Sequence, residues 1–149
     1  CLEALEALVT PQTELLDLGC GSGILSIASL LFGAQRAVGV DIDPLAVKTA
    51  LENGALNGFV PPRYTILEGS LADRVRGRFD LVAANIVADV IIPFCAQVRA
   101  YLKPGGVFLT SGIIDARERE VLAAFEQNGR CVRQRREDGG WLSFVCTAG

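Results

Sequence analysis

Short apolar runs that alternate with segments of helical length are the strongest constraint on the fold of this chain. Buried strands are predicted at residues 13–19, 36–42, 63–69, 79–84 and 106–112. Helices are predicted at residues 24–33, 44–56, 88–102 and 115–129. Strands that are apolar along their whole length are typical of a parallel sheet with helices on both faces. Because such crossovers are right-handed, the sheet is predicted to be doubly wound.

The two ends of the chain add a helix and a hairpin to this pattern. Leu2, Leu5 and Leu8 recur every three residues, which predicts an amphipathic helix. Two further strands, at 131–137 and 141–147, are separated by "DGG", a signal for a tight hairpin. The predicted fold is α/β, a doubly wound, mostly parallel seven-stranded sheet with a C-terminal antiparallel hairpin and helices on both faces.

Local signals mark where several helices begin and end. Asp43 is predicted to be an N-cap with Pro44 in the first turn, and Gly33 is predicted to be a C-cap. The helix at 88–102 is predicted to stop at "KPGG", and Pro93 inside it predicts either a later start or a kink. Without repeats or linkers, the 149 residues are predicted to form one domain.

The charge balance argues against a domain that grips nucleic acid through its phosphates. The net charge is −3, whereas phosphate binding needs a basic face. One local exception is the group Arg130, Arg133, Arg135 and Arg136. This group is either a solvated strand edge or a contact for an acidic partner, and the sequence leaves both interpretations open.

Cysteine and histidine usage restrict the compartment and the site chemistry. The five cysteines, at positions 1, 20, 95, 131 and 146, show no CxxC spacing. We therefore expect free, mostly buried thiols, a cytoplasmic protein and no zinc site. The chain has no histidine, so no histidine base and no metal site are proposed. No apolar leader or membrane span is visible, so no membrane partner is expected.

The predicted turn between the first strand and its helix is rich in glycine. Gly19, Gly21 and Gly23 alternate in "DLGCGSG", so backbone can approach a ligand closely with helix N–H groups aimed at it. The dinucleotide fingerprint would need glycine at position 24, which is Ile24. Asp17 precedes the loop, and its carboxylate suits a ligand with a positive amine or sulfonium. The alternative is a tight turn without a ligand.

Polar residues follow the next two strands at the same predicted edge of the sheet. Asp41 ends the second strand, where a carboxylate would accept hydrogen bonds from both hydroxyls of a ribose. Ser70 and Leu71 follow the third strand and would flank an adenine, although a plain loop explains them equally well. Ligands of doubly wound sheets bind at this edge, near the point where the strand order reverses.

Asn85 is a neutral amide at the predicted end of the fourth strand, in "FDLVAANIVADV". That strand is expected to neighbour the first across the point where the order reverses. The amide oxygen could accept a hydrogen bond from an amine N–H and so aim the nitrogen lone pair at an electrophile. The alternative is that Asn85 caps the following helix, because asparagine is a favoured N-cap.

Together these motifs resemble the S-adenosylmethionine-dependent methyltransferases of the seven-stranded Rossmann-like class. The similarity is closest to the catalytic domain of the ribosomal protein L11 methyltransferase (PrmA) family, through "LDLGCGSGILSIA", "VGVDIDPLAV", "FDLVAANIVADV" and "GGWLSFV". The resemblance implies that Gly19, Gly21 and Asp41 bind S-adenosylmethionine and that Asn85 faces cofactor and target amine. The residues expected at the cofactor are Asp17, Gly19, Gly21, Gly23, Asp41, Ser70, Leu71 and Asn85.

The resemblance also implies features outside this sequence. The family has an N-terminal domain that recruits substrate and a threonine-containing segment before the first helix that helps to enclose the cofactor. The chain opens on "CLEALEALV" and has no methionine. Residues 1–149 are therefore expected to be the catalytic domain alone, with the substrate-binding domain missing upstream of Cys1.

The predicted activity is N-methylation of lysine side chains or α-amino groups of a ribosomal protein, with Asn85 orienting the amine. Asp89 is a possible carboxylate near Asn85, and Cys95 is expected in the core. Trp141, beside the hairpin turn, either forms part of the substrate-channel wall or packs against the sheet edge. The alternatives are a small-molecule or RNA N-methyltransferase on the same scaffold and a catalytically silent cofactor-binding or interaction module. An oligomeric state is not predicted.

Overall fold

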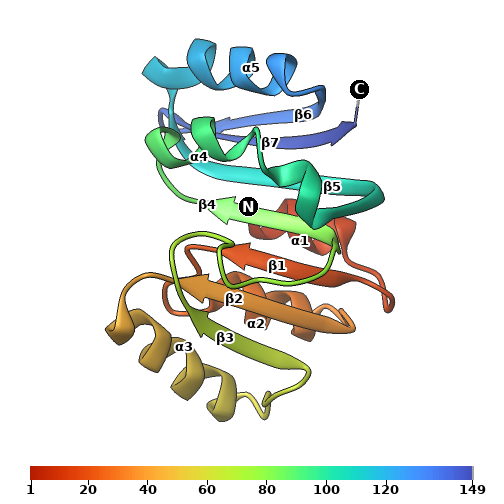
Figure 1. Cartoon of the computed structure of the whole chain (residues 1–149), viewed down its shortest axis with the longest axis vertical. Helices are drawn as coiled ribbons and strands as arrows, with labels where there is room; N and C mark the ends of the chain where they lie inside the picture. The colour runs from red at the N-terminus through yellow and green to blue at the C-terminus, as the bar shows by residue number, and fades with distance from the viewer. Residues whose placement is uncertain (149) are drawn as a thin grey trace.

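The computed structural model describes residues 1–148 and forms one seven-stranded sheet with helices on both sides (Figure 1). The helices are α1 (Leu2–Leu8), α2 (Ile24–Leu31), α3 (Pro44–Leu56), α4 (Ala88–Phe94) and α5 (Glu118–Gln127), with 3₁₀ turns η1 (Val98–Tyr101) and η2 (Asp115–Arg117). The strands are β1 (Glu14–Leu18), β2 (Arg36–Asp41), β3 (Tyr64–Glu68), β4 (Phe79–Asn85), β5 (Leu102–Ile114), β6 (Arg130–Asp138) and β7 (Trp141–Ala148). No described helix has the length and apolar character needed to cross a membrane.

The strand order is β3-β2-β1-β4-β5-β7-β6. Strands β1 to β5 pair in parallel, and β7 runs antiparallel to both β5 and β6. The order reverses between β1 and β4, because β2 and β3 lie on one side of β1 and all later strands on the other. This arrangement confirms the predicted doubly wound sheet with its C-terminal antiparallel hairpin.

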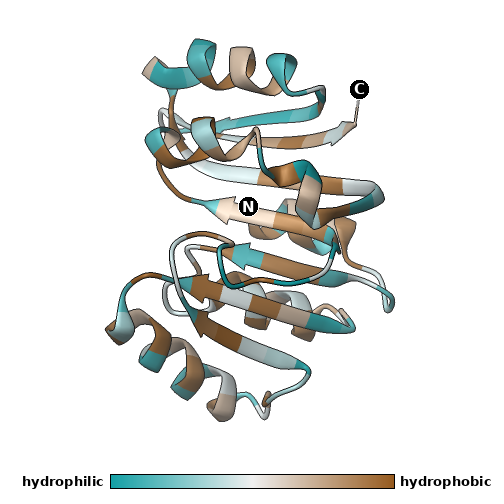
Figure 2. Cartoon of the chain, viewed as in Figure 1, coloured by the Kyte–Doolittle hydropathy of each residue, from teal (hydrophilic) through white to brown (hydrophobic). Residues whose placement is uncertain are grey.

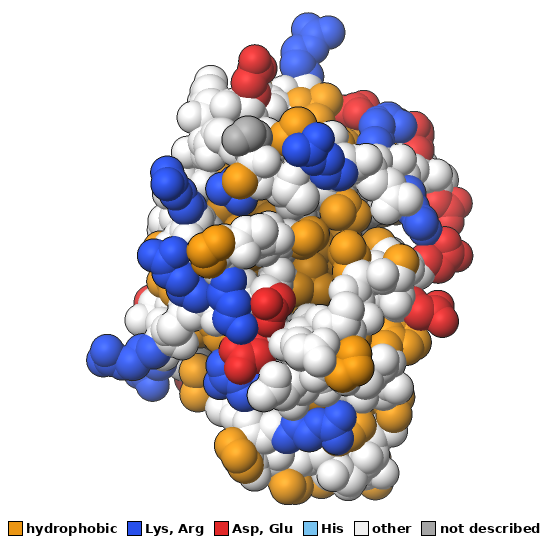
Figure 3. All heavy atoms as spheres, turned by 90° about the vertical axis from the view of Figure 1, so that its right-hand side faces the viewer, with side chains coloured by type: hydrophobic (Ala, Val, Ile, Leu, Met, Phe, Trp, Pro, Cys, Tyr) orange, Lys and Arg blue, Asp and Glu red, His pale blue; other side chains and the backbone are white. Residues whose placement is uncertain are grey.

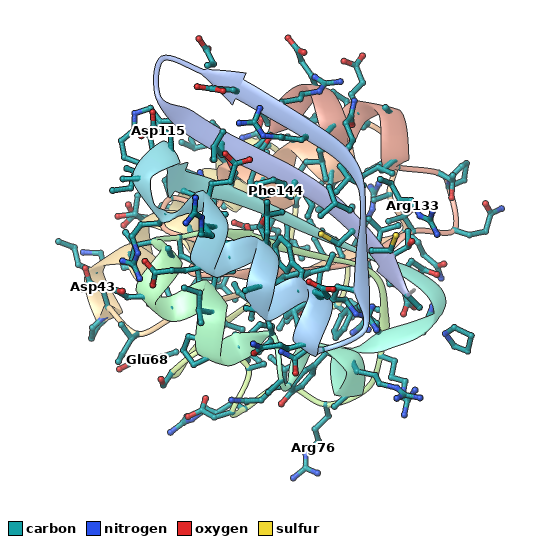
Figure 4. The ribbon with its side chains drawn as sticks, turned by 90° about the horizontal axis from the view of Figure 1, so that it is seen from above. Asp43, Glu68, Arg76, Asp115, Arg133 and Phe144 are labelled. Carbon is teal, nitrogen blue, oxygen red and sulfur yellow. The ribbon has the colours of Figure 1, made fainter. Side chains whose placement is uncertain are left out.

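Apolar side chains leave the central strands in both directions, which makes two hydrophobic layers. Leu15 of β1 packs in the layer beneath α1, α2 and α3, whereas the adjacent Leu16 packs in the layer beneath α4 and α5. Figure 2 shows the hydrophobic residues concentrated along the central strands and on the inner sides of the helices. In Figure 4, Phe144 lies inside beneath α5, while Asp43, Arg76 and Arg133 point outward. Burial on both faces explains why these strands lack a polar alternation.

The predicted length of the helix at 88–102 is wrong. The helix ends at Phe94, directly after Pro93, and the chain continues through a turn into η1. Proline has no N–H to donate to the preceding turn, which weakens the helical ladder there. Beyond this point the backbone bonds three residues back, as from Gln97 N–H to the Phe94 carbonyl at 2.8 Å.

The "KPGG" stretch was predicted to stop that helix, but it lies inside β5. The pairing of β5 with β4 begins at Leu102, breaks, and resumes at Val107, so residues 103–106 form a bulge. Gly105 has a φ of +77°, a conformation that glycine also adopts in turns. The bulge therefore needs the same glycine that a turn would need, which is why "KPGG" resembles a turn.

The hairpin between β6 and β7 is confirmed at the predicted place. Asp138 and Trp141 are its last cross-strand pair, so its loop is Gly139–Gly140. Both glycines have positive φ, +57° and +84°, as a type I′ turn requires. Because β6 runs in the same direction as β5, this turn lies at the carboxyl edge of the parallel strands. Figure 3 shows the opposite edge, with a group of Lys and Arg side chains on its left flank.

Candidate active site

The glycine loop after β1 places backbone, without side chains, at the carboxyl edge of the sheet. Gly19 and Gly21 have φ values of +64° and +54°, which side-chain-bearing residues rarely adopt. A Cβ on Gly19 would lie 2.6 Å from Cγ2 of Ile86, whereas a Cβ on Gly21 would meet no atom within 4 Å. The chain after β4 therefore packs directly on Gly19, and Gly21 leaves open space above the loop.

Gly23 serves packing. It is the N-cap residue of α2, with a left-handed φ of +85°. A Cβ there would lie 2.4 Å from the hydroxyl oxygen of Tyr64 and 3.3 Å from Cβ of Ala50. Tyr64 is buried and donates its hydroxyl hydrogen to the Ala50 carbonyl at 2.7 Å, so it cannot move aside. The third predicted glycine is thus explained by the contact of α2 with β3 and α3.

Asp41 holds the glycine loop and the start of the next helix together. Its Oδ2 accepts a hydrogen bond from Gly21 N–H at 2.9 Å, and its Oδ1 accepts one from Asp43 N–H at 3.0 Å. Asp43 is the N-cap of α3, as predicted, and accepts from Leu45 N–H at 2.9 Å. Two backbone donors therefore fix the orientation of the Asp41 carboxylate, whose other lone pairs remain available to hydroxyl donors.

Asp17 lies buried beneath the same loop, with 1% of its surface exposed. Ser26 Oγ donates a hydrogen bond to its Oδ2 at 2.8 Å. Burial raises the pKa of Asp17 to about 7; the Ser26 hydrogen bonds oppose this rise, and the nearby charge of Asp41 adds to it. A carboxyl group with this pKa is half charged near neutral pH, so a cationic ligand group beside it would favour the charged form.

A first hollow, of about 360 Å³, brings together residues that follow β1, β2, β3 and β4. Its lining residues are Gly19, Val40, Asp41, Ile42, Gly69, Ser70, Leu71, Ile86 and Val90. The sequence predicted that Gly19, Asp41, Ser70 and Leu71 lie together, and the structure places them so. Leu71 has a φ of +49°, which is uncommon for a residue with a side chain. We name this cavity the nucleoside hollow, since its carboxylate and apolar walls suit a ribose and a flat base.

A second, wider hollow of about 810 Å³ borders the start of α2 and contains Asn85. Its lining residues are Cys1, Leu2, Glu3, Ile24, Leu25, Asn85, Ser111, Arg136, Glu137, Asp138, Trp141, Leu142 and Ser143. Asn85 is the last residue of β4, and Trp141 is 55% exposed, so it does not pack fully against the sheet edge. We name this cavity the amide hollow.

The alternative role of Asn85 as a helix cap is wrong. The N-cap of α4 is Val87, and no side chain caps that helix. A Cβ on Gly112 would lie 2.9 Å from Asn85 Oδ1, so this glycine of β5, with a φ of +78°, makes room for the amide. The strand end thus presents the Asn85 side chain to the amide hollow.

Other candidate groups are engaged elsewhere in the fold. Asp89 forms an ion pair with Arg117 at 2.8 Å and lines neither hollow. Cys95 lies in the core as predicted, and burial raises its pKa to about 11. Burial, with smaller contributions from Asp17 and Asp41, raises the pKa of Cys20 to about 12. These thiols remain protonated near neutral pH, which disfavours them as nucleophiles.

Two of the four arginines of the β6 group form ion pairs within the chain. Arg135 forms ion pairs with Glu118 and with Glu137, the latter at 3.1 Å. Arg136 forms an ion pair with Glu3 of α1 at 2.6 Å. The interpretation as a solvated strand edge therefore explains these two side chains.

Sequence reasoning missed several wall residues. Ile86 borders the nucleoside hollow and packs on Gly19, while Ser111 and Leu25 border the amide hollow. Ile86 directly follows Asn85 in the sequence, so its place near the site could have been inferred. Ser111 and Leu25 carry no chemical signal and are placed by the pairing of β5 with β4 and by the start of α2.

Comparison with known proteins places these features in one family. A family model described as ribosomal protein L11 methyltransferase (PrmA) matches residues 1–148. A ribosomal protein L11 methyltransferase of Pelotomaculum thermopropionicum is 44% identical over 145 residues, which cover 97% of this chain and 47% of that relative. The chain thus spans about half the length of the curated relative.

Two solved structures share the fold of this chain. The ribosomal protein L11 methylase of Lactobacillus delbrueckii subsp. bulgaricus superposes with a TM-score of 0.95 at 28% identity, over 99% of this chain and 76% of that chain. An RNA methyltransferase of Salinibacter ruber, solved with S-adenosyl-L-homocysteine, shares the fold with a TM-score of 0.75 at 23% identity, over 97% of this chain and 87% of that one. The chain belongs to the ribosomal protein L11 methyltransferase (PrmA) family.

Proposed function

We propose that this chain binds S-adenosylmethionine and transfers its methyl group to amino groups, on lysine side chains or an α-amino terminus, of a ribosomal protein. The observation that carries the proposal is the position of Asn85. Asn85 caps no helix, and its residue lines the amide hollow. The next residue in the sequence, Ile86, lines the nucleoside hollow. Family membership supports the proposal, since the relative from Pelotomaculum thermopropionicum is named for methylation of ribosomal protein L11.

The residues around the glycine loop fit the parts of S-adenosylmethionine. Asp41 would accept hydrogen bonds from the ribose hydroxyls, and Leu71 and Ile86 offer apolar walls to the adenine. The space above Gly21 leaves room for the amino-acid part, with the Asp17 carboxyl buried below. When bound, the sulfonium would supply an activated methyl group, which leaves as the S–C bond breaks and its electron pair remains on sulfur.

Within the proposed reaction, this chain's own residues position and desolvate the amine. A free lysine has a pKa of about 10.4, so roughly one molecule in a thousand is neutral near pH 7. Withdrawal from water into the amide hollow would lower that pKa and raise the neutral fraction. The Asn85 oxygen would accept one N–H and aim the nitrogen lone pair at the methyl carbon. An amide cannot act as a base, so Asn85 orients the amine and does not deprotonate it.

The test is calorimetry with S-adenosylmethionine combined with transfer of labelled methyl groups. We expect Asn85→Ala to retain cofactor affinity within about threefold and to lower turnover at least about tenfold, the scale of one lost positioning contact. Asp89→Asn is the control and should leave both quantities unchanged, because Asp89 pairs with Arg117 outside the hollows. Loss of cofactor affinity with unchanged turnover in Asn85→Ala would contradict the role given to Asn85.

The substrate class requires a separate measurement. Ribosomes and free ribosomal proteins from cells that lack the enzyme are incubated with labelled cofactor, and the label is located in protein or in RNA. We expect the label in protein amino groups. Because this chain spans about half the length of its curated relative, the full-length relative is assayed in parallel. Label in RNA alone, or in neither fraction with the full-length relative, would overturn the proposed substrate.

A further inference from the structure

The hairpin between β6 and β7 brings a carboxylate and an indole to the wall of the amide hollow. Asp138 and Trp141 are directly opposite each other across the hairpin, and opposite residues of an antiparallel pair project to the same face. Both side chains belong to residues that line the hollow, together with Asn85. Asp138 has no part in binding the cofactor or in orienting the amine at Asn85.

The hairpin tip is a fixed platform. Trp141 also pairs with Ile114 at the end of β5, and Asp115 N–H donates a hydrogen bond to the Gly140 carbonyl at 3.0 Å. The tip is therefore bonded to β5 and to the start of η2 as well as within itself. Hydrogen bonds therefore hold the backbone on both sides of Asp138 and Trp141.

Asp138 is the charged residue of the hollow that has no ion-pair partner among residues 1–148. Arg136 and Glu3 neutralise each other at 2.6 Å, and Glu137 pairs with Arg135 at 3.1 Å. Within residues 1–148, no ion pair or side-chain hydrogen bond engages the Asp138 carboxylate. The hollow thus contains a carboxylate without an ion-pair partner, and the indole ring opposite it across the hairpin is 55% exposed.

We propose that Asp138 and Trp141 form a binding site for an ammonium group at the wall of the amide hollow, and that this pair selects a cationic amine as substrate. The choice of an amine substrate rests on the proposed function. An indole face attracts a cation within about 6 Å of the ring, and a carboxylate attracts it by charge. Together they favour a lysine-type side chain over a neutral chain of the same length and over an anion. Asp138 binds the charged amine at the wall of the hollow, whereas transfer needs the neutral amine, withdrawn from water at Asn85. Asp138 is therefore a specificity-determining residue and takes no part in the transfer.

The test uses the intrinsic fluorescence of Trp141, which is the only tryptophan of the chain. The probes are Nα-acetyl-lysine methylamide and its neutral analogue Nα-acetyl-norleucine methylamide, titrated at millimolar concentration. We expect the lysine probe to change the fluorescence and to bind at least about threefold more tightly than the norleucine probe, the scale of an exposed charge pair. Equal responses to the two probes, or no response to the lysine probe, would overturn the proposal.

Variants then assign the effect to the carboxylate. We expect Asp138→Asn to weaken the lysine probe about threefold to fivefold, and Asp138→Glu to restore most of the loss. Glu126→Gln, which removes one exposed carboxylate of α5 outside both hollows, should bind like the parent chain. Unchanged binding in Asp138→Asn, with a far-ultraviolet spectrum like the parent's, would overturn the proposal. Because this readout needs no methyl transfer, absence of transfer would refute the proposed function alone.

Discussion

The charge of the Asp17 carboxyl group near neutral pH depends on the fold. Its pKa of about 7 lies above its ordinary value of 3.8, because burial disfavours the charged form. Between about pH 4 and pH 7, the folded chain holds a proton that the unfolded chain has released. The contribution of Asp17 to the free energy of unfolding therefore falls as pH rises through this range and is constant above it.

We expect Asp17→Asn to remove this pH dependence while keeping an acceptor for Ser26. The free energies of unfolding of the parent and of Asp17→Asn are measured in urea between pH 4 and pH 8. The contributions of the other titrating groups cancel in the difference between the two proteins. The variant should gain stability relative to the parent as pH rises to about 7, by at most about 1.4 kcal/mol per pH unit. A difference that stays constant with pH would show that Asp17 has an ordinary pKa.

Asp41, the last residue of β2, and Asp43, two residues later, are expected to have separate roles in binding and in folding. Asp41→Ala removes a charged acceptor from the nucleoside hollow and frees Gly21 N–H, so affinity for S-adenosylmethionine should fall about tenfold or more. Asp43→Ala removes the N-cap of α3 and should lower the free energy of unfolding by about 1 kcal/mol with little effect on affinity. Calorimetry and urea unfolding measure both quantities, and the reverse pattern would exchange the two roles.

Residue roles were predictable where the partner is local in sequence. The cap at Asp43 depends on a backbone N–H two residues later, so the sequence pattern contains it. The role of Asn85 needed a choice between a cap and the hollow, which depends on how the chain turns after β4. The packing of Gly23 on Tyr64 and of Ile86 on Gly19 joins residues far apart in sequence, and no periodicity or spacing signals such a contact.

At the scale of elements, the contact between α3 and β3 depends on a glycine inside the helix. A Cβ on Gly54 would lie 2.2 Å from Cε1 of Tyr64, whose ring is buried and whose hydroxyl is bonded to Ala50. Alanine has the better helix propensity, by about 1 kcal/mol, but overpacking typically costs about 1–3 kcal/mol. We expect Gly54→Ala to lower the free energy of unfolding by up to about 2 kcal/mol in urea titrations.

The matched control is the neighbouring exposed residue of the same helix. Ala55→Gly should lower stability by about 1 kcal/mol through helix propensity alone. Because Gly54 and Ala55 line neither hollow, the two variants should leave cofactor affinity nearly unchanged. If Gly54→Ala stabilised the chain, Tyr64 would be free to move and the contact would not limit the spacing of α3 and β3.

Elements were predictable where burial is uniform and failed where two local signals compete. The strands were found because both faces are covered and their sequences are apolar throughout. The prediction of a helix at 88–102 gave more weight to the apolar run around Pro93 than to the backbone N–H that proline lacks. In the structure, α4 ends at Phe94. The bulge at 103–106 has the glycines of a turn, and the pairing that keeps it in β5 comes from β4, which the local sequence does not show.

For the whole molecule, the sheet joins the two hydrophobic layers into one unit. Neighbouring residues of the central strands pack into opposite layers, so neither layer can open without exposing the other side of the same strands. The layer beneath α4 and α5 also continues from β1 to β7. We therefore infer that the described chain unfolds in one cooperative step.

The cysteines report on this inference from both layers. Cys20 lies in the layer beneath α2, and Cys95 and Cys146 lie in the opposite layer; all three are buried, whereas Cys1 and Cys131 are partly exposed. Burial raises the pKa of each of the three buried thiols, to about 12, 11 and 12 respectively, so their thiolates are scarce in the folded chain. At pH 8 without denaturant, we expect a thiol reagent to modify Cys1 and Cys131 readily and the buried three slowly.

With increasing urea, the three buried thiols should become reactive at one common midpoint, equal to the midpoint of the far-ultraviolet signal. Mass spectrometry of peptides assigns the modified position at each urea concentration. Because Cys20 and Cys146 belong to different layers, a common midpoint requires both layers to open together. An earlier midpoint for Cys20 would show that the layer beside the glycine loop opens alone. Saturating S-adenosylhomocysteine should then raise all three midpoints together, because a ligand held at the shared sheet edge stabilises the whole cooperative unit.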